Sequence, residues 1–358
     1  MTNSLATSTI DDPSKKSRLR YRPSANSFLT ALLLAGLVYL LLPFFKWAIL
    51  DATWVGTTRS NCVDTGACWV FVKVWLPRFV YGFYPDAEVW RANVCFAICC
   101  STIAWVFCRS LPGRRYAVVF LVLVFPFLNF AILRGGFLGL ASVQTDQWGG
   151  LLLTMVVASI GIIASLPLGI LLALGRRSQM PLVQSLCAVF IELWRGVPLI
   201  TVLFMASVMF PLFLPPEMHV DKLVRALVAV ALFSGAIMAE VVRGGLQAVS
   251  RGQYEAASAL GMGYWTTISL IVLPQALKIV VPGVVNIFIS LFKDTVLVGI
   301  ISLFDFLLMI QTALTNPDWL GLRLEGYLFA AAVFGSFCFG ISRLGRNIER
   351  ELAKSHNR

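Results

Sequence analysis

The sequence predicts an all-helical protein that crosses a membrane about eight times. Of its 358 residues, 58% are hydrophobic and only 13% are charged, whereas a soluble domain has roughly 45–50% apolar and 25% charged residues. The mean hydropathy is +0.81. Eight apolar runs have the length of about 17–25 residues that a helix needs to cross the hydrocarbon core. This composition excludes a water-soluble globular protein, a disordered chain and a nucleic-acid binder.

The first apolar run, residues 28–50, follows a polar segment with five Lys and Arg residues between positions 15 and 22. It is too long for the core of a cleavable signal peptide, so it is predicted to span the membrane. Its basic flank is expected to stay inside, which makes 1–27 a cytoplasmic tail. The other seven runs lie at 91–108, 116–133, 149–174, 182–212, 224–242, 268–292 and 324–342.

Two segments between the spans stand out. Residues 51–90 form a long outer loop. Residues 293–313 are apolar but contain Asp305, and Lys293-Asp294 stands where a span should end. We therefore expect this second segment to be irregular or partly re-entrant.

The distribution of basic residues gives the orientation. With both termini inside, 17 Lys and Arg residues lie on inner segments and nine on outer segments. Cytoplasmic loops carry the excess of Lys and Arg. We therefore expect both the N-terminal tail and the C-terminal tail at 344–358 to be cytoplasmic.

Two of the eight cysteines, Cys62 and Cys68, share the outer loop. Because that face would be oxidising, they are predicted to be able to form a disulfide. The remaining six are expected to be small packing residues within spans; they are Cys95, Cys99, Cys100, Cys108, Cys187 and Cys338. No Cys/His spacing predicts a metal site.

The chain divides near residue 148. Residues 28–147 contain three spans and few intramembrane polar groups, whereas 148–343 contains five spans and nearly all the unusual charges. Charged residues inside a membrane are costly, so each is a candidate functional residue. They are Glu192, Arg195, Glu240, Arg243, Lys293, Asp294 and Asp305.

The strongest pattern lies in the inner loop between the sixth and seventh spans, 243–267. Glu255-Ala256-Ala257 favours a short helix, and Gly261 permits a sharp turn after it. Pro274 suits the first turn of the next helix, where a backbone N–H would have no intrahelical partner. A short helix across the inner face could transmit force from a soluble partner to the spans.

This loop resembles the signature loop of the permease subunits of bacterial ABC importers: Glu-Ala-Ala, three residues, Gly, nine residues, then Ile-x-Leu-Pro. From about 149 to 343 the chain resembles the polar amino-acid permease family of the histidine/glutamine type. The three preceding spans resemble those of the longer permease of general L-amino acid importers. The supporting segments are Glu192–Leu199, Ala239–Gly245, Gly252–Ala257, Leu273–Leu277 and Lys293–Thr295. Two positions depart from the family pattern, Ile237 where Tyr is frequent and Val296 where Ser is frequent, and both make the site less polar.

The resemblance implies a five-helix type I ABC importer permease core at 148–343, preceded by three extra helices. It implies that the inner loop docks on a separate ATP-binding subunit; the residues concerned are Gly252, Gln253, Glu255, Ala256, Ala257 and Gly261. It further implies a heterodimer with a related second permease, two copies of the ATPase, a periplasmic amino-acid-binding protein and an L-amino acid substrate in a bacterial inner membrane. No catalytic residue and no cofactor are expected in this subunit, since ATP and Mg would be held by the ATPase.

The intramembrane charges leave alternatives open. Glu192 with Arg195, and Glu240 with Arg243, are three residues apart and so share a helix face. They either switch partners during transport or form static ion pairs. Lys293, Asp294 and Thr295 either form a gate in the substrate path or an interfacial loop. The aromatic residues of 69–84 either form an interfacial belt or help to seat the binding protein.

Two other functions compete with a transporter subunit. An ion-coupled secondary transporter or channel would need a buried acidic relay and no inner loop of fixed spacing. An intramembrane enzyme would need a nucleophile with a base or a metal, and the two histidines, His219 and His356, lie in predicted loops.

Overall fold

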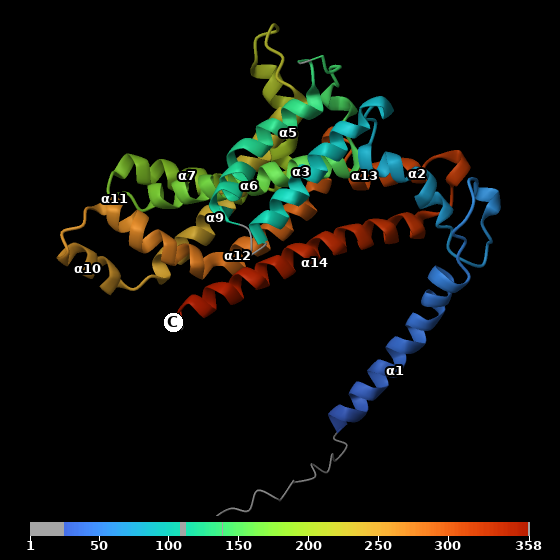
Figure 1. Cartoon of the computed structure of the whole chain (residues 1–358), viewed down its shortest axis with the longest axis horizontal. Coiled ribbons are helices and arrows are strands. Elements are labelled where there is room, and N and C mark those ends of the chain that lie inside the picture. The colour runs from blue at the N-terminus through green and yellow to red at the C-terminus, as the bar shows by residue number, and fades with distance from the viewer. Residues whose placement is uncertain (1–24, 108–111, 138, 357–358) are drawn as a thin grey trace, which may run out of the picture.

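The computed structural model describes residues 25–107, 112–137 and 139–356, and these are helical and irregular, without a β-strand. The tail at 1–24 and Cys108 lie outside the described residues. Four long helices run side by side along the long axis of the molecule (Figure 1). They are α6 (Gly150–Arg176), α9 (Lys222–Ala248), α12 (Leu273–Asp294) and α14 (Arg323–His356).

Within the described part of the chain, seven helices are long and apolar enough to cross a membrane, and the number rises to eight if one bent pair is counted as a span. The prediction of about eight spans is confirmed. Besides the four helices above they include α1 (Ala25–Phe45), α3 (Val89–Phe107), α5 (Phe125–Arg134) with the preceding α4 (Arg114–Val119), and the bent pair.

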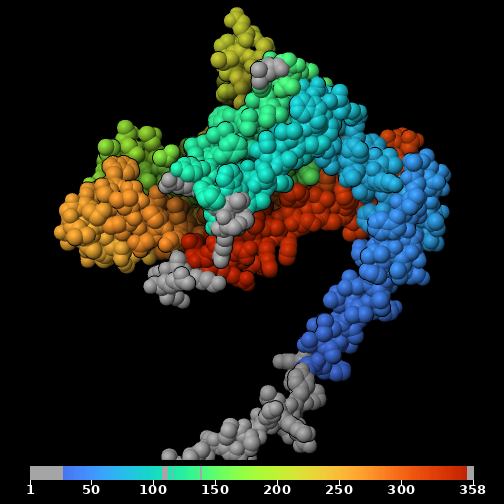
Figure 2. Space-filling view, viewed as in Figure 1, coloured from blue at the N-terminus to red at the C-terminus, as the bar shows by residue number. Residues whose placement is uncertain are grey.

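The bent pair is α7 (Pro181–Gly196) and the segment Leu199–Phe213, which begins with α8 (Leu199–Phe204); together they correspond to the predicted run 182–212. The two parts meet at 102°. The break falls at Gly196-Val197-Pro198, where Val197 is extended, because a residue before proline is driven out of the helical region. The chain after the break projects from the body as the olive protrusion of Figure 2.

The predicted outer loop differs from the structure, because residues 70–81 form helix α2 (Val70–Tyr81). Its Phe71 and Phe79 are completely buried against α13 (Phe306–Leu314) and α14, and Tyr84 beyond it is buried as well. These three aromatic side chains therefore belong to the core, not to an interfacial belt or an exposed docking surface. The Tyr84 hydroxyl donates to the Leu133 carbonyl oxygen at 2.8 Å, and burial raises its pKa to about 12.

The segment 293–313 is irregular, as expected. Helix α12 ends at Asp294, a 3-10 helix covers Thr295–Ile301, and α13 begins after Asp305. Beyond the last predicted span, the structure differs again: α14 continues through 344–356, so this part of the C-terminal tail is a helical extension.

Helices α6 and α9 form the tightest pair in the bundle. A Cβ at Gly169 would lie 2.5 Å from the Met238 Cγ, and one at Gly161 would lie 2.9 Å from a Val230 methyl carbon. Small residues let two membrane helices approach closely. This pair sets the position of everything attached to its two ends.

Candidate coupling site and charged cluster

The predicted inner helix is α10 (Arg251–Ala259), and α11 (Tyr264–Thr267) follows it. Gly261 has φ +70°, the Gly261 N–H donates to the Ser258 carbonyl, and the Met262 N–H donates to the Ala257 carbonyl. This is a Schellman ending, which glycine permits because its left-handed conformation costs no Cβ clash. The turn leads into α11, which continues through a π-helical turn at Ile268–Val272 into α12 without a break. Pro274 therefore lies just after this turn inside a continuous helix, and not in the first turn of a helix as predicted.

The predicted docking residues divide between two faces of α10. Gly252, Gln253, Glu255 and Ala256 are exposed, as is Gly261 after the helix. Ala257, by contrast, is 1% exposed. The exposed residues form a small, mostly uncharged surface around one carboxylate, with Ala257 as the packing contact beneath it.

Side chains tie α10 to two spans. The Gln275 Nε2 of α12 donates to the Gln253 Oε1 at 3.1 Å. Arg177, at the end of α6, donates to both the Tyr254 hydroxyl and the Leu246 carbonyl at 3.1 Å. Arg177 thus connects the last turn of α9 to α10, and the sequence indicates no role for it beyond that of an inner basic residue.

Glu240 of α9 is the centre of a charged cluster. Its carboxylate, 16% exposed, pairs with Arg243 at 2.6 Å, with Arg195 at 3.6 Å and with Arg176. The predicted pair of Glu240 and Arg243 is present. Glu192 pairs with Arg176 at 3.0 Å, and not with Arg195 as the spacing of three suggests. Arg176 therefore bridges two acids, and sequence reasoning missed it because it stands just past a span with the other inner basic residues.

Lys293, Asp294 and Thr295 lie far from this cluster. Gly150, the first residue of α6, pairs through its backbone with Asp305, shortly after this segment. Arg176 of the charged cluster is the last residue of the same helix. At 1.5 Å per residue, roughly 40 Å separates the two regions. Lys293 is exposed, Asp294 is partly buried, and the buried Thr295 hydroxyl donates to the Phe292 carbonyl at 2.8 Å.

The two buried acids of the described residues already have backbone partners. The Asp305 carboxylate caps α13 by accepting the N–H groups of Leu307 and Leu308 at 3.0 and 3.2 Å. Glu325 accepts the Cys68 N–H at 3.2 Å. Asp305 therefore anchors the start of α13, and Glu325 anchors the loop that contains Cys68. No group of three potential metal ligands occurs in the part of the chain that the structure describes.

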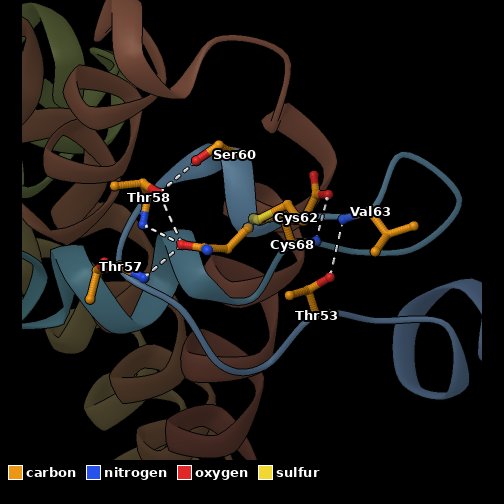
Figure 3. The surroundings of a disulfide bond; sticks show 9 residues. Thr53, Thr57, Thr58, Ser60, Cys62, Val63 and Cys68 are labelled. Carbon is orange, nitrogen blue, oxygen red and sulfur yellow. Dashed lines mark hydrogen bonds between the residues drawn. A yellow bond between two sulfur atoms is a disulfide. The ribbon is translucent and has the colours of Figure 1, made fainter.

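A disulfide joins Cys62 to Cys68 in the segment between α1 and α2, with their Cα atoms 5.4 Å apart (Figure 3). Hydrogen bonds hold the loop around it: Asn61 Oδ1 accepts from the N–H groups of Thr57 and Thr58, and Thr53 Oγ1 accepts from the Val63 N–H.

An apolar groove of about 650 Å³ lies between α7, the segment after the break and the first half of α9. Its walls include Leu193, Trp194, Met209, Phe213 and Val228. Phe213 and its neighbour Leu212 are each 80% exposed.

Comparison with known proteins assigns the family. The model described as "Binding-protein-dependent transport system inner membrane component" matches residues 165–354. The inner membrane amino-acid ABC transporter permease protein YhdY of Escherichia coli is 51% identical over 329 residues, which cover 91% of this chain and 90% of that protein. The chain belongs to the family of binding-protein-dependent transport system inner membrane components.

Two further comparisons agree with this family. The glutamate/glutamine/aspartate/asparagine transport system permease protein BztC of Rhodobacter capsulatus is 37% identical over 400 residues, covering 92% of this chain and 91% of that protein. A chain of "Crystal structure of an amino acid ABC transporter with histidines" has a TM-score of 0.50 and 27% identity, covering 55% of this chain and 90% of its own length. This inner membrane component is therefore a multi-span protein of the inner membrane with a type I ABC permease core, and ATP hydrolysis takes place on a separate subunit.

Proposed function

We propose that this protein is the permease subunit of an ATP-driven importer that receives L-amino acids from a periplasmic binding protein and releases them into the cytoplasm. The observation that carries the proposal is α10, a short exposed helix between two spans that is closed by Gly261 and carries Glu255-Ala256-Ala257. The names of the two full-length relatives support amino acids as the substrate class.

Helix α10 acts as the coupling helix in this proposal. Gly252, Gln253, Glu255 and Ala256 contact the ATPase, while Ala257 and Gly261 hold the helix in its docking pose. Nucleotide-driven motion of two ATPase copies, which hold the ATP and Mg, moves α10 and converts the permease between outward and inward states, a rigid-body change of the kind that nucleotides bias.

The second proposed partner is a related permease. The groove beside α9 is apolar and opens at the surface of the molecule. Exposed apolar patches of this kind mark interaction sites. A second permease that covers the groove and the projecting Leu212-Phe213 would complete a heterodimer. A single binding protein would then deliver the substrate to the outer face of this heterodimer.

The remaining sites are assigned by position. Lys293, Asp294 and Thr295, at the outer end of α12, are proposed as a gate in the substrate path. Glu192, Arg195, Glu240 and Arg243, together with Arg176, are proposed as an inner cluster that holds or switches the bundle. We propose that both termini lie in the cytoplasm. We also propose that residues 28–147 contain the three extra helices and that residues 148–343 form the core. Cys62 and Cys68 then face the oxidising periplasm.

Site-specific crosslinking tests the coupling role. In a variant whose free cysteines are replaced, Ala256→Cys should crosslink to a cysteine on the co-purified ATPase. Leu320→Cys, which is 51% exposed in the outer loop before α14, is the matched control and should not crosslink. Absence of the ATPase from the purified complex, or equal crosslinking at both positions, contradicts the proposal.

Reconstitution distinguishes the importer from an ion-coupled transporter. The two most buried acids, Asp305 and Glu325, are already engaged by backbone N–H groups, so neither is free to serve in an acidic relay. Uptake of a radiolabelled L-amino acid mixture into proteoliposomes should require ATP and the binding protein. Uptake driven by an ion gradient alone would establish the alternative.

A further inference from the structure

Seven aromatic rings form an unbroken series of contacts that joins α2, in the N-terminal unit (residues 28–147), to the end of α12. Successive ring centroids are 5.4 to 5.8 Å apart, within the range preferred by aromatic pairs. In order, the rings are Trp319, Phe71, Phe79, Phe329, Phe306, Phe334 and Phe292. Phe292 directly precedes Lys293-Asp294-Thr295.

The series is buried where it leaves the N-terminal unit. Phe71 and Phe79 of α2 have no exposed surface, and Phe306 of α13 is 1% exposed. Protein interiors are close-packed and barely compressible, so they transmit a displacement to their neighbours. A shift of α2 therefore has to move the rings on α14, α13 and α12, or open a cavity.

The backbone repeats the same connection. Gly82, the residue after α2, pairs with Trp148, and a Cβ at Gly82 would lie 2.3 Å from the Gly149 Cα. The Gly150 N–H donates to the Phe304 carbonyl at 2.7 Å, and the Phe306 N–H donates to the Thr154 hydroxyl at 3.0 Å. The end of α2, the start of α6 and the segment before α13 are thus in direct contact.

We infer that helix α2 is a positioning element for the segment 293–305, which it holds closed against the outer end of α6. The inference rests on the proposed role of Lys293, Asp294 and Thr295 as a gate. Phe79 and Phe329 are positioning residues, since they act on the segment through Phe306. The N-terminal unit thereby gains a function: it sets how firmly the outer part of the substrate path is shut.

Leakage measures this closure. Phe79→Leu and Phe329→Leu keep an apolar side chain but remove a ring from the series. In proteoliposomes loaded with a radiolabelled L-amino acid mixture, each variant complex should release label without ATP about fivefold faster than the wild type. Because both residues act on one segment, their effects should not add. The double variant should therefore release label measurably more slowly than the sum of the two single effects predicts.

Phe96→Leu is the matched control. Phe96 lies in α3 of the same unit, packs partly buried against the larger core and belongs to no ring pair of the series. Its release rate should equal that of the wild type. The inference is overturned if Phe79→Leu releases label at the wild-type rate, or if Phe96→Leu releases it as fast as Phe79→Leu does. Either result overturns it whatever the thermal stability of the variants.

A second measurement does not depend on transport. Thr295 is 2% exposed, so Thr295→Cys should react slowly with a maleimide, and Phe79→Leu should raise that rate about fivefold. An unchanged rate overturns the inference even where the complex imports amino acids normally. A raised rate in a complex that imports no amino acid supports the positioning role and refutes the proposed function.

Discussion

Glu240 is a single carboxylate shared by three guanidinium groups, and it lies mostly out of solvent. Removing one partner of a buried ion pair typically costs about 3–5 kcal/mol, whereas an exposed pair contributes about 0–1 kcal/mol. Glu240→Gln should therefore lower the free energy of unfolding by about 2–3 kcal/mol, since partial exposure of the arginines screens the charges. Thermal unfolding in detergent measures the loss.

Glu192→Gln is the matched change, because the Glu192 side chain is 67% exposed and, among the described residues, forms an ion pair with Arg176 only. Its cost should stay below about 1 kcal/mol. Equal costs for the two variants would show that Glu240 does not organise the cluster.

The cluster also shows what the sequence can predict at this scale. The spacing of Glu240 and Arg243 placed them on one helix face, and the structure pairs them. The same spacing puts Glu192 and Arg195 on one helix face, but in the structure Glu192 pairs with Arg176 on another helix. Local periodicity fixes which residues share a face of one helix, but contacts between helices depend on how the helices pack.

Gly261 combines a left-handed backbone with open space, since a Cβ there would meet nothing within 4 Å. Gly261→Ala should cost only the backbone penalty of about 1–2 kcal/mol and keep ATP-driven uptake. Gly261→Asp adds a charge beside the proposed docking surface, so the complex should reach the membrane but hydrolyse ATP without uptake. Normal uptake by Gly261→Asp would contradict the docking role of this turn.

At the scale of elements, the disulfide loop is attached to the first turn of α14. Cys68 is bonded to Cys62 six residues away, and its N–H donates to Glu325 in the first turn of α14. Closing a loop this short should stabilise the protein by about 2 kcal/mol in the chain-entropy model. Replacing both cysteines by serine should lower the thermal midpoint by a corresponding amount, and adding reductant to that variant should change nothing further.

The same cysteines report orientation. After reduction, a maleimide that cannot cross the membrane should label the partly exposed Cys62 in intact spheroplasts, whereas Cys68 is 1% exposed and should react slowly. Labelling that requires disruption of the membrane would place the loop inside and reverse the proposed topology.

Which elements the sequence could predict follows from the solvent that each one meets. Apolar runs of sufficient length located all eight candidate spans, because lipid requires them, but the length of the run 182–212 did not show that its helix is bent between α7 and α8. Helix α2 was missed because its apolar face is covered by α13 and α14, which lie more than 200 residues later in the chain. No sequence pattern within 51–90 shows that α13 and α14 pack against this segment.

At the scale of the whole molecule, the N-terminal helices contact the bundle at the end where α6 and α14 begin. Helix α1 projects from the body and has no buried residue in its most apolar window, and α2 provides the contact between its loop and the core (Figure 1). At the opposite end, α10 and the charged cluster lie together. The core thus has a separate attachment at each end, one to the N-terminal unit and one proposed for the ATPase.

Between these ends, the apolar groove and the projecting Phe213 are proposed to bind the second permease. Phe213→Asp places a charge that would lose its hydration on assembly, so the amount of second permease that co-purifies should fall by about tenfold or more. Val55→Asp is the control, because Val55 is 79% exposed in the outer loop and Phe213 is 80% exposed. The control complex should remain intact, and both variants should reach the membrane in normal amounts. A Phe213→Asp complex that keeps its second permease would show that this face contacts lipid, and the heterodimer would then have to form elsewhere on the core.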